Sequence, residues 1–217
     1  MHRATKTGLA RTAAITVGIS HCRLLLLIVM VMIVAGGGYL GYLRLSGNFH
    51  EVVAGELYRS GQMSPALLSR YVRQYGIRTI VNLRPDRNGA WYRDEVATAA
   101  TLNVRHIDFG MTDYKIVAPE RAEDLIEILR DARKPILIHC KAGADRSGLA
   151  SVLYLNKIKG DSVADSGRQL SLYYGHIAIP YLSRSFAMDT SWQQLQTDFD
   201  DAAIETAEAE ANLPHIE

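Results

Sequence analysis

The amino-acid sequence predicts an α/β domain in which helices flank a mostly parallel central sheet, preceded by one N-terminal transmembrane helix. Two observations carry this prediction. From residue 64 onward, short apolar segments rich in β-branched residues alternate with segments of helical periodicity, which is the pattern of crossover units in a parallel sheet. Ahead of them, residues 24–43 form an uncharged apolar run that is long enough to cross a bilayer.

The N-terminal segment divides into a basic lead, residues 1–23, and an anchor, residues 24–45. Four basic residues and no acidic one precede the apolar run: Arg3, Lys6, Arg11 and Arg23. This bias predicts a cytoplasmic N-terminus and places the rest of the chain outside the cytoplasm, which in a bacterium is the periplasm. The small residues Ala35-Gly36-Gly37 leave a cleaved signal peptide as the alternative. We expect an uncleaved single-pass anchor, with residues 46–49 as a linker.

The globular part, residues 46–190, is expected to begin its helices at Ser64-Pro65, where a hydroxyl cap precedes a proline, and Gly76 is a natural stop for that helix. Strands are predicted over residues 77–83 and 103–109, with a helical stretch over 92–102 between them.

A helix opening at Pro119 leads into a third predicted strand, residues 135–139. Its apolar residues recur at helical spacing on one face: Ala122, Leu125, Ile126 and Leu129. An apolar helix is then expected from Gly148 to Lys159, followed by a helix over residues 163–174. The C-terminal segment, residues 191–217, predicts a polar helix and an acidic tail.

Composition limits the classes of function. The 217-residue chain has 24 lysines and arginines against 23 aspartates and glutamates, so no overall basic charge suggests a nucleic-acid partner. Its two cysteines, Cys22 and Cys140, do not predict a disulfide framework. Cys140 is either a buried small side chain or a reactive thiol, and its neighbours have to decide between the two.

Those neighbours form the stretch HCKAGADRSG, residues 139–148, between an apolar strand and a helix. Backbone N–H groups of such a loop and the positive end of the following helix can wrap a tetrahedral oxyanion, and Arg146 can clamp two of its oxygens. The same positive field favours the thiolate form of Cys140. The intervening loop residues are Lys141, Ala142, Gly143, Ala144 and Asp145.

His139-Cys140, five residues and Arg146-Ser147-Gly148 resemble the signature loop of the cysteine-dependent phosphatases, the protein tyrosine and dual-specificity class, in its compact bacterial branch. The resemblance covers roughly residues 52–174. It implies a metal-independent phosphomonoester hydrolase that needs no cofactor and acts on a phosphorylated protein, lipid or small molecule. By matching position, Cys140 would be the nucleophile that forms a phosphocysteine, and Arg146 the phosphate clamp. Ser147 would ease departure of the thiolate, and His139 would orient the loop.

The same resemblance implies a general acid on the loop ahead of the Pro119 helix. Asp113 is the first candidate and Asp108, at the end of a predicted strand, the second. In a weaker motif, NLRPD, Arg84 could approach the phosphate, or it could pair with Asp94 or Glu95. His176 could line the cleft or serve a structural purpose.

Other functions remain open at this point. One is a catalytically weak phosphate-binding or interaction module, and another is a sulfur-transfer enzyme, against which the Arg-Ser-Gly ending of the loop argues. A phosphoinositide or other non-protein phosphatase is a third. Ala144 and Asp145 disfavour a polyphosphorylated inositol, because basic residues near these positions would hold its extra phosphates.

Overall fold

The computed structural model describes the backbone of residues 6–211 and the side chains of residues 23–199. Contacts divide the chain into two units, Met1–Tyr42 and Leu43–Glu217. The first charge of the predicted basic lead, Arg3, and the end of the predicted acidic tail, residues 212–217, lie outside the described residues.

The N-terminal unit consists of helix α1, Lys6–Leu45, which continues past the unit's boundary. Its stretch Arg23–Leu45 has 23 residues and a mean hydropathy of 2.4. By length and composition this stretch could cross a membrane, and a signal sequence near an N-terminus has the same features. Its apolar side chains from Leu24 to Val34 are exposed to the surroundings.

Residues 46–49 are part of the globular fold, and the expectation that they form a linker is wrong. Asn48 is buried, and its backbone N–H donates to the carbonyl of Leu43 at 2.6 Å. Its side-chain amide donates to the carbonyls of Ala142 and Tyr174, both at 2.9 Å. These bonds tie the segment to the predicted phosphate loop, which a free linker would not contact.

A five-stranded sheet with the order β1-β2-β5-β3-β4 forms the centre of the second unit. Strands β2, β5, β3 and β4 run parallel, and β1 pairs with β2 in the antiparallel sense. The strands are β1 His50–Val53, β2 Leu57–Ser60, β3 Thr79–Asn82, β4 Arg105–Asp108 and β5 Ile136–His139. The predicted mostly parallel α/β architecture is confirmed, and β1 and β2 add to the three strands that the sequence predicts.

The strand register aligns the carboxyl ends of the parallel strands. Ser60 and Asn82 are both partners of His139, and Asn82 is also the partner of Asp108. In open α/β sheets ligands bind at this edge. The last residues of four strands therefore lie side by side directly below the loop that begins with Cys140.

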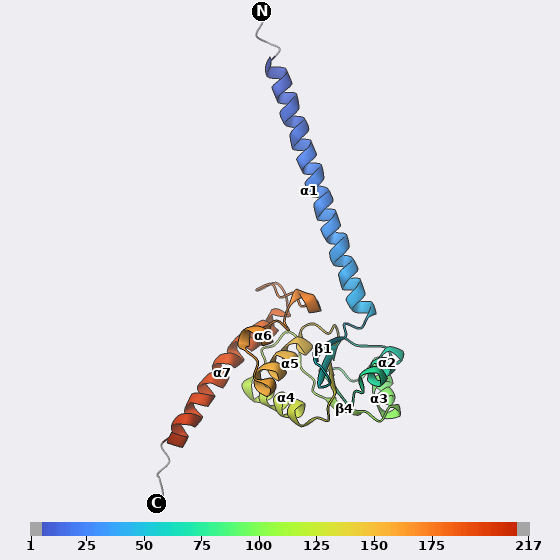
Figure 1. Ribbon diagram of the computed structural model, residues 1–217, viewed down its shortest axis with the longest axis vertical. Helices are drawn as coiled ribbons and strands as arrows, with labels where there is room; N and C mark the ends of the chain where they lie inside the picture. Colours follow the sequence, from blue (N-terminus) through green and yellow to red (C-terminus); the bar gives the residue numbers. More distant parts are fainter. Residues whose placement is uncertain (1–5, 212–217) are drawn as a thin grey trace, which may run out of the picture. The chain divides into compact units, whose positions relative to one another are not determined.

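Helices cover both faces of the sheet, with α2 and α3 apart from α4 and α5 (Figure 1). Leu137 and Ile80 pack with side chains of α2 and α3, whereas Ile136 and Ile138 pack with those of α4 and α5. The helices are α2 Pro65–Tyr75, α3 Ala90–Thr101, α4 Pro119–Asp131, α5 Arg146–Tyr154, π-helix η1 Leu155–Lys159, α6 Val163–Gly167, 3₁₀-helix η2 Leu172–Tyr174 and α7 Phe186–Ala211.

Helix termini follow the local chemistry of the sequence. The Ser64 hydroxyl accepts the N–H of Leu67 at the start of α2, and Gly76 adopts a left-handed φ of 63° at its end. Helix α5 begins at Arg146, two residues before the predicted Gly148. Arg146 is thereby placed in the first turn, where the helix dipole is positive.

The predicted helix over residues 163–174 is wrong. It breaks into α6 and η2 after Gly167. The carbonyl of Gln169 accepts a hydrogen bond from the buried guanidinium of Arg59 at 2.7 Å. Because Arg59 also donates to the Gln169 side chain at 2.9 Å, it holds this segment against β2 in a conformation other than a continuous helix, and a long-range contact overrides the local propensity.

The predicted terminal helix begins at Phe186, five residues before Ser191. Its first turns are not a solvated face, because Met188, Trp192 and Leu195 are buried in the core beside α4 and α5. This helix therefore belongs to the globular fold.

Candidate active site

The predicted phosphate loop connects β5 to α5 at the carboxyl edge of the sheet. The N–H of Cys140 donates to the carbonyl of Ser60 at 3.3 Å, and the carbonyl of His139 accepts from Leu83 at 2.9 Å. Strands on both sides thus hold the start of the loop. Gly143 has a φ of 78°, and a Cβ there would lie 2.4 Å from the backbone nitrogen of Gly61, so only glycine fits.

The Cys140 side chain is buried, with hydrogen-bonding groups around its sulfur. The backbone N–H of Gly143 donates to Sγ at 3.2 Å, and the Ser147 hydroxyl lies 3.5 Å from it. The structure therefore brings together Cys140 and Ser147, two residues that the sequence analysis put in one site.

Arg146, the first residue of α5, is 7% exposed and reaches across to the loop between β4 and α4. Its Nη1 donates to the carbonyl of Met111 at 3.3 Å, and its Nη2 lies 3.9 Å from the Asp113 carboxylate. The loop that carries Asp113 is thus in contact with the predicted phosphate clamp.

Asp108 lies in different surroundings. Its carboxylate accepts hydrogen bonds from Asn82 at 2.9 Å and from the Tyr92 hydroxyl at 2.6 Å, and Arg87 lies 3.7 Å away. These bonds hold the Asp108 side chain in place at the end of β4. Of the two candidate acids, Asp113 is the one whose side chain pairs with Arg146.

Arg84 forms its ion pair with Asp86 at 2.8 Å, so the suggested pairing with Asp94 or Glu95 is wrong. Its guanidinium also lies 3.5 Å from the ring centre of Trp91, and its Nη1 donates to Gln62 at 3.3 Å. These contacts hold Arg84 on the β3–α3 loop.

Arg59 is a site residue that the sequence analysis missed. It is fully buried in β2, and its Nη2 donates to the carbonyls of Gly143 and Ala144 at 2.9 and 2.8 Å. Nη1 donates to Gln169, and the ring of Tyr174 lies 4.0 Å from the guanidinium carbon. Burial lowers the pKa of Arg59 to about 10, so it stays charged at neutral pH. An arginine inside an apolar strand, LYRS, was the available signal.

His176 connects the phosphate loop to α7. Its Nδ1 lies 2.7 Å from an oxygen of Asp145, and its Nε2 lies 2.8 Å from one of Asp189. Because carboxylates only accept, both ring nitrogens carry protons in this arrangement. Burial alone would lower the pKa of His176, but the hydrogen bonds to both aspartates outweigh burial and raise it.

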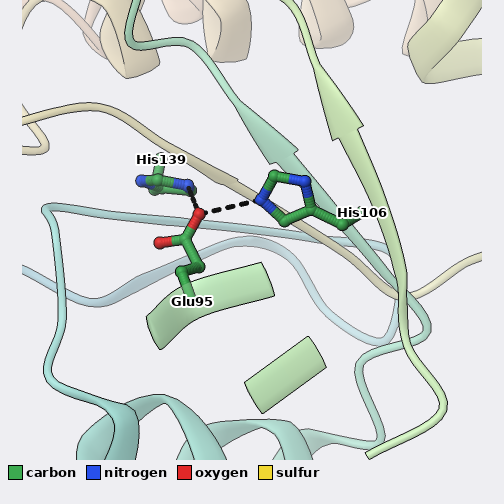
Figure 2. Close-up of side chains that lie close together, drawn as sticks. All are labelled: Glu95, His106 and His139. Atoms are coloured by element: carbon green, nitrogen blue, oxygen red, sulfur yellow. Dashed lines mark hydrogen bonds and ion pairs between the residues drawn. The ribbon is translucent and has the colours of Figure 1, made fainter. Parts of the chain in front are cut away.

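A second buried cluster lies on the other face of the sheet from Cys140. Glu95, His106 and His139 point toward one another (Figure 2), and their ligating atoms lie within 4.8 Å. Two histidines and one glutamate are a donor set that Zn²⁺ accepts. However, one oxygen of Glu95 accepts from His106 and lies 2.9 Å from the Nε2 of His139, and the other accepts from Gln62 at 2.7 Å, so both oxygens of Glu95 already have partners in the protein.

With this site at the end of this sheet, the chain belongs to the tyrosine phosphatase family, whose model matches residues 39–162, more than half of the sequence. A curated relative is the Drosophila melanogaster dual specificity protein phosphatase Mpk3, 28% identical over 116 residues. The match covers 54% of this chain but only 27% of that protein.

Solved structures share the fold. The core catalytic domain of the S. cerevisiae PP-IP phosphatase Siw14, in complex with citrate, matches with a TM-score of 0.55 at 23% identity, covering 77% of this chain and 94% of that one. P. aeruginosa TpbA in complex with pTyr matches with a TM-score of 0.50 at 20% identity, covering 60% and 76%.

Replacing Arg59 with lysine is expected to destabilise the protein by about 3 kcal/mol or more, because carbonyls that the guanidinium satisfies would be left buried and unpaired. Chemical denaturation of the full chain in detergent measures this free energy. The same change at Arg168, whose side chain is 79% exposed, is the control and should have little effect. Equal effects of the two changes would contradict the role given to Arg59.

His176 predicts a pH-dependent stability. Its pKa is raised in the folded state, so its stabilisation is complete below the pKa of the unfolded chain and is lost as the pH rises through the folded value. The difference in unfolding free energy between the wild type and His176→Gln should therefore be larger near about pH 6 than near about pH 9. A difference that is constant over this range would show that the two carboxylates do not hold an imidazolium.

Proposed function

We propose that the chain is a metal-independent phosphomonoester hydrolase that acts through a phosphocysteine on Cys140. The observation that carries the proposal is the convergence of the Gly143 N–H and the Ser147 hydroxyl on a buried Cys140 sulfur, at the end of the sheet where Arg146 opens a helix. A structural cysteine in a core would not be surrounded by donors and a cation in this way.

In the first step the Cys140 thiolate attacks phosphorus. A sulfur–phosphorus bond forms while the bond to the leaving oxygen breaks, and that oxygen takes a proton from Asp113. Arg146 and the backbone N–H groups of residues 141–145 hold the equatorial oxygens, whose negative charge they stabilise in the transition state. The 3.9 Å contact between Asp113 and Arg146 supports this assignment, because a carboxyl beside the phosphate clamp is within reach of the leaving oxygen.

In the second step water attacks the phosphocysteine and Asp113, now ionised, takes the water's proton. The sulfur–phosphorus bond breaks, and the sulfur leaves as a thiolate. The Ser147 hydroxyl, 3.5 Å from Sγ, donates to the sulfur as its charge returns. Inorganic phosphate is released and the enzyme regains its starting state.

The domain boundaries and location are part of the proposal. Residues 1–23 would be the cytoplasmic lead, 24–45 an uncleaved anchor and 46–190 the catalytic domain outside the cytoplasm, with 191–217 as the C-terminal helix and tail. The helical stretch Arg23–Leu45 supports the anchor. A thiolate in an oxidising compartment requires a reductant to stay active.

Phosphotyrosine is the substrate class that we favour. TpbA was solved with pTyr, whereas the Siw14 domain belongs to a PP-IP phosphatase. A polyphosphorylated substrate would bring its extra phosphates close to Asp145, whose carboxylate is held at the edge of the loop by His176. Repulsion between like charges disfavours that substrate.

Full-length protein in detergent is expected to hydrolyse an aryl phosphate in the presence of a reductant, and a chelator should leave the rate unchanged. Cys140→Ser should abolish turnover, because a hydroxyl at this position is not ionised at neutral pH, but it should still bind phosphate. Steady-state kinetics and equilibrium binding measure the two properties. Turnover that persists in Cys140→Ser, or that a chelator removes, would contradict the mechanism.

Asp113→Asn should lower kcat about 10²-fold or more for phosphotyrosine, whose leaving oxygen needs a proton, and less for p-nitrophenyl phosphate, whose leaving group is stable without one. Asp108→Asn is the matched control. It should not change the relative rates of the two substrates, because Asp108 is bound to Tyr92 and Asn82. The reverse result would make Asp108 the acid.

A further inference from the structure

The hydrogens between Glu95 and its two histidines can be assigned from chemistry. Burial alone would raise the pKa of Glu95, but hydrogen bonds from His106, His139 and Gln62 outweigh it and hold the pKa below its ordinary value. Glu95 is therefore an ionised carboxylate, which only accepts. The Nε2 of His106 forms a hydrogen bond with its Oε1 at 2.9 Å and therefore carries its hydrogen there. The Nε2 of His139 lies 2.9 Å from the same oxygen in an ion pair, and because a lone pair at that position would be repelled by the carboxylate, this nitrogen carries its hydrogen as well (Figure 2).

The three residues come from separate elements, and His139 is the last residue of β5. Glu95 projects from α3 and is 4% exposed, while the side chain of His106 on β4 is 10% exposed. His139 is 2% exposed and directly precedes Cys140. The carboxylate thus connects helix α3 to the strand end from which the nucleophile projects.

We propose that Glu95 is a positioning residue for phosphoryl transfer, which holds the ring of His139 in one orientation and one tautomer and so fixes the strand end that carries Cys140. This inference rests on the proposed function. Neighbouring side chains of a strand point to opposite faces, so the His139 ring is directed toward α3 while the Cys140 thiol is directed toward α5.

The geometry explains why anchoring the ring would affect the thiol. Only the backbone joins His139 to Cys140, and its hydrogen bonds to Leu83 and Ser60 fix the strand end in the plane of the sheet. Rotation of the peptide about the strand axis would swing the ring and Sγ together. The ion pair with Glu95 opposes that rotation, and a displacement of about 1 Å at a reacting atom can cost about 10²-fold in rate.

Glu95 is itself held from the opposite side. The Nδ1 of His106 lies 3.9 Å from Asp108, and Asp108 accepts from Tyr92 and Asn82. The side-chain amide of Gln62, which follows β2, donates a hydrogen bond to the second oxygen of Glu95. Asp108, the second candidate acid, thereby contributes to holding the cluster rather than facing Arg146.

A double-mutant cycle tests the proposal on the full-length protein in detergent with an aryl phosphate. Glu95→Gln, which keeps the size of the side chain and removes its charge, should lower kcat about tenfold or more while KM and the inhibition constant of inorganic phosphate change less than about twofold. In a His139→Gln background the same change should alter kcat less than about twofold, because the route through the ring is already lost.

The matched control is Glu56→Gln. Glu56 accepts hydrogen bonds from Tyr154 and Lys159. It directly precedes β2, so it lies at the amino ends of the parallel strands, whereas Cys140 lies at their carboxyl ends. Its replacement should leave kcat unchanged in both backgrounds. The proposal is overturned if Glu95→Gln leaves kcat within about twofold of the wild type, or if the effects of Glu95→Gln and His139→Gln multiply in the double variant.

Nitrogen-15 NMR of the histidine rings tests the contact between Glu95 and His139 without a variant, because it shows which ring nitrogen carries the proton. In the wild-type protein, His139 and His106 should both carry a proton on Nε2, and an unprotonated Nε2 on His139 would overturn the proposal even if Glu95→Gln does not fold. If the wild-type chain hydrolyses no phosphate ester, the proposed function fails, and the ring tautomers still test the anchoring of His139 by Glu95.

Discussion

The buried guanidinium of Arg59 is the contact on which the geometry of the site depends. A loop that binds an oxyanion must turn its N–H groups toward the ligand, so its carbonyls point the other way, into the protein. Arg59 accepts no bonds and donates to the carbonyls of Gly143 and Ala144 from below. The carbonyl of Ala142, which shares a peptide with the N–H of Gly143, accepts from the Asn48 amide at 2.9 Å, and that N–H is directed at the sulfur of Cys140. The loop's shape is therefore set by a charge placed inside the fold before any substrate arrives.

Two histidines extend this arrangement to elements that do not touch substrate. His176 holds the loop residue Asp145 against Asp189 of α7, and His139 holds the strand end against Glu95 of α3. In both clusters a buried ring is matched to carboxylates, which offsets the cost of taking a charge out of water. Through these two histidines, helices on both faces of the sheet are connected to the phosphate loop, residues 140–146.

Much of this molecule could be predicted from local sequence. Ser64, Pro65 and Gly76 defined a helix, the β-branched segments defined three parallel strands, and the spacing of Cys140 and Arg146 indicated the oxyanion loop. What local sequence could not supply were contacts between distant segments. The partners of Arg59 lie 84 to 110 positions away in the chain, and one of them, Gln169, ends the helix that was expected over residues 163–174. Nothing near Glu95 in the sequence indicated that it would meet His106 and His139, because the sheet order brings them together.

The central claim is that phosphate passes through the sulfur of Cys140. The most direct test is to mix the Asp113→Asn variant with p-nitrophenyl phosphate, whose leaving group needs no proton, stop the reaction in acid, and analyse the Cys140 peptide by mass spectrometry. With proton transfer to and from Asp113 removed, the phosphocysteine should hydrolyse slowly enough to be trapped, and the account predicts one added phosphoryl group on Cys140 that is absent in the Cys140→Ser control. Turnover by Asp113→Asn with an unmodified Cys140 peptide at every time point, or with the phosphoryl group on another residue, would contradict it.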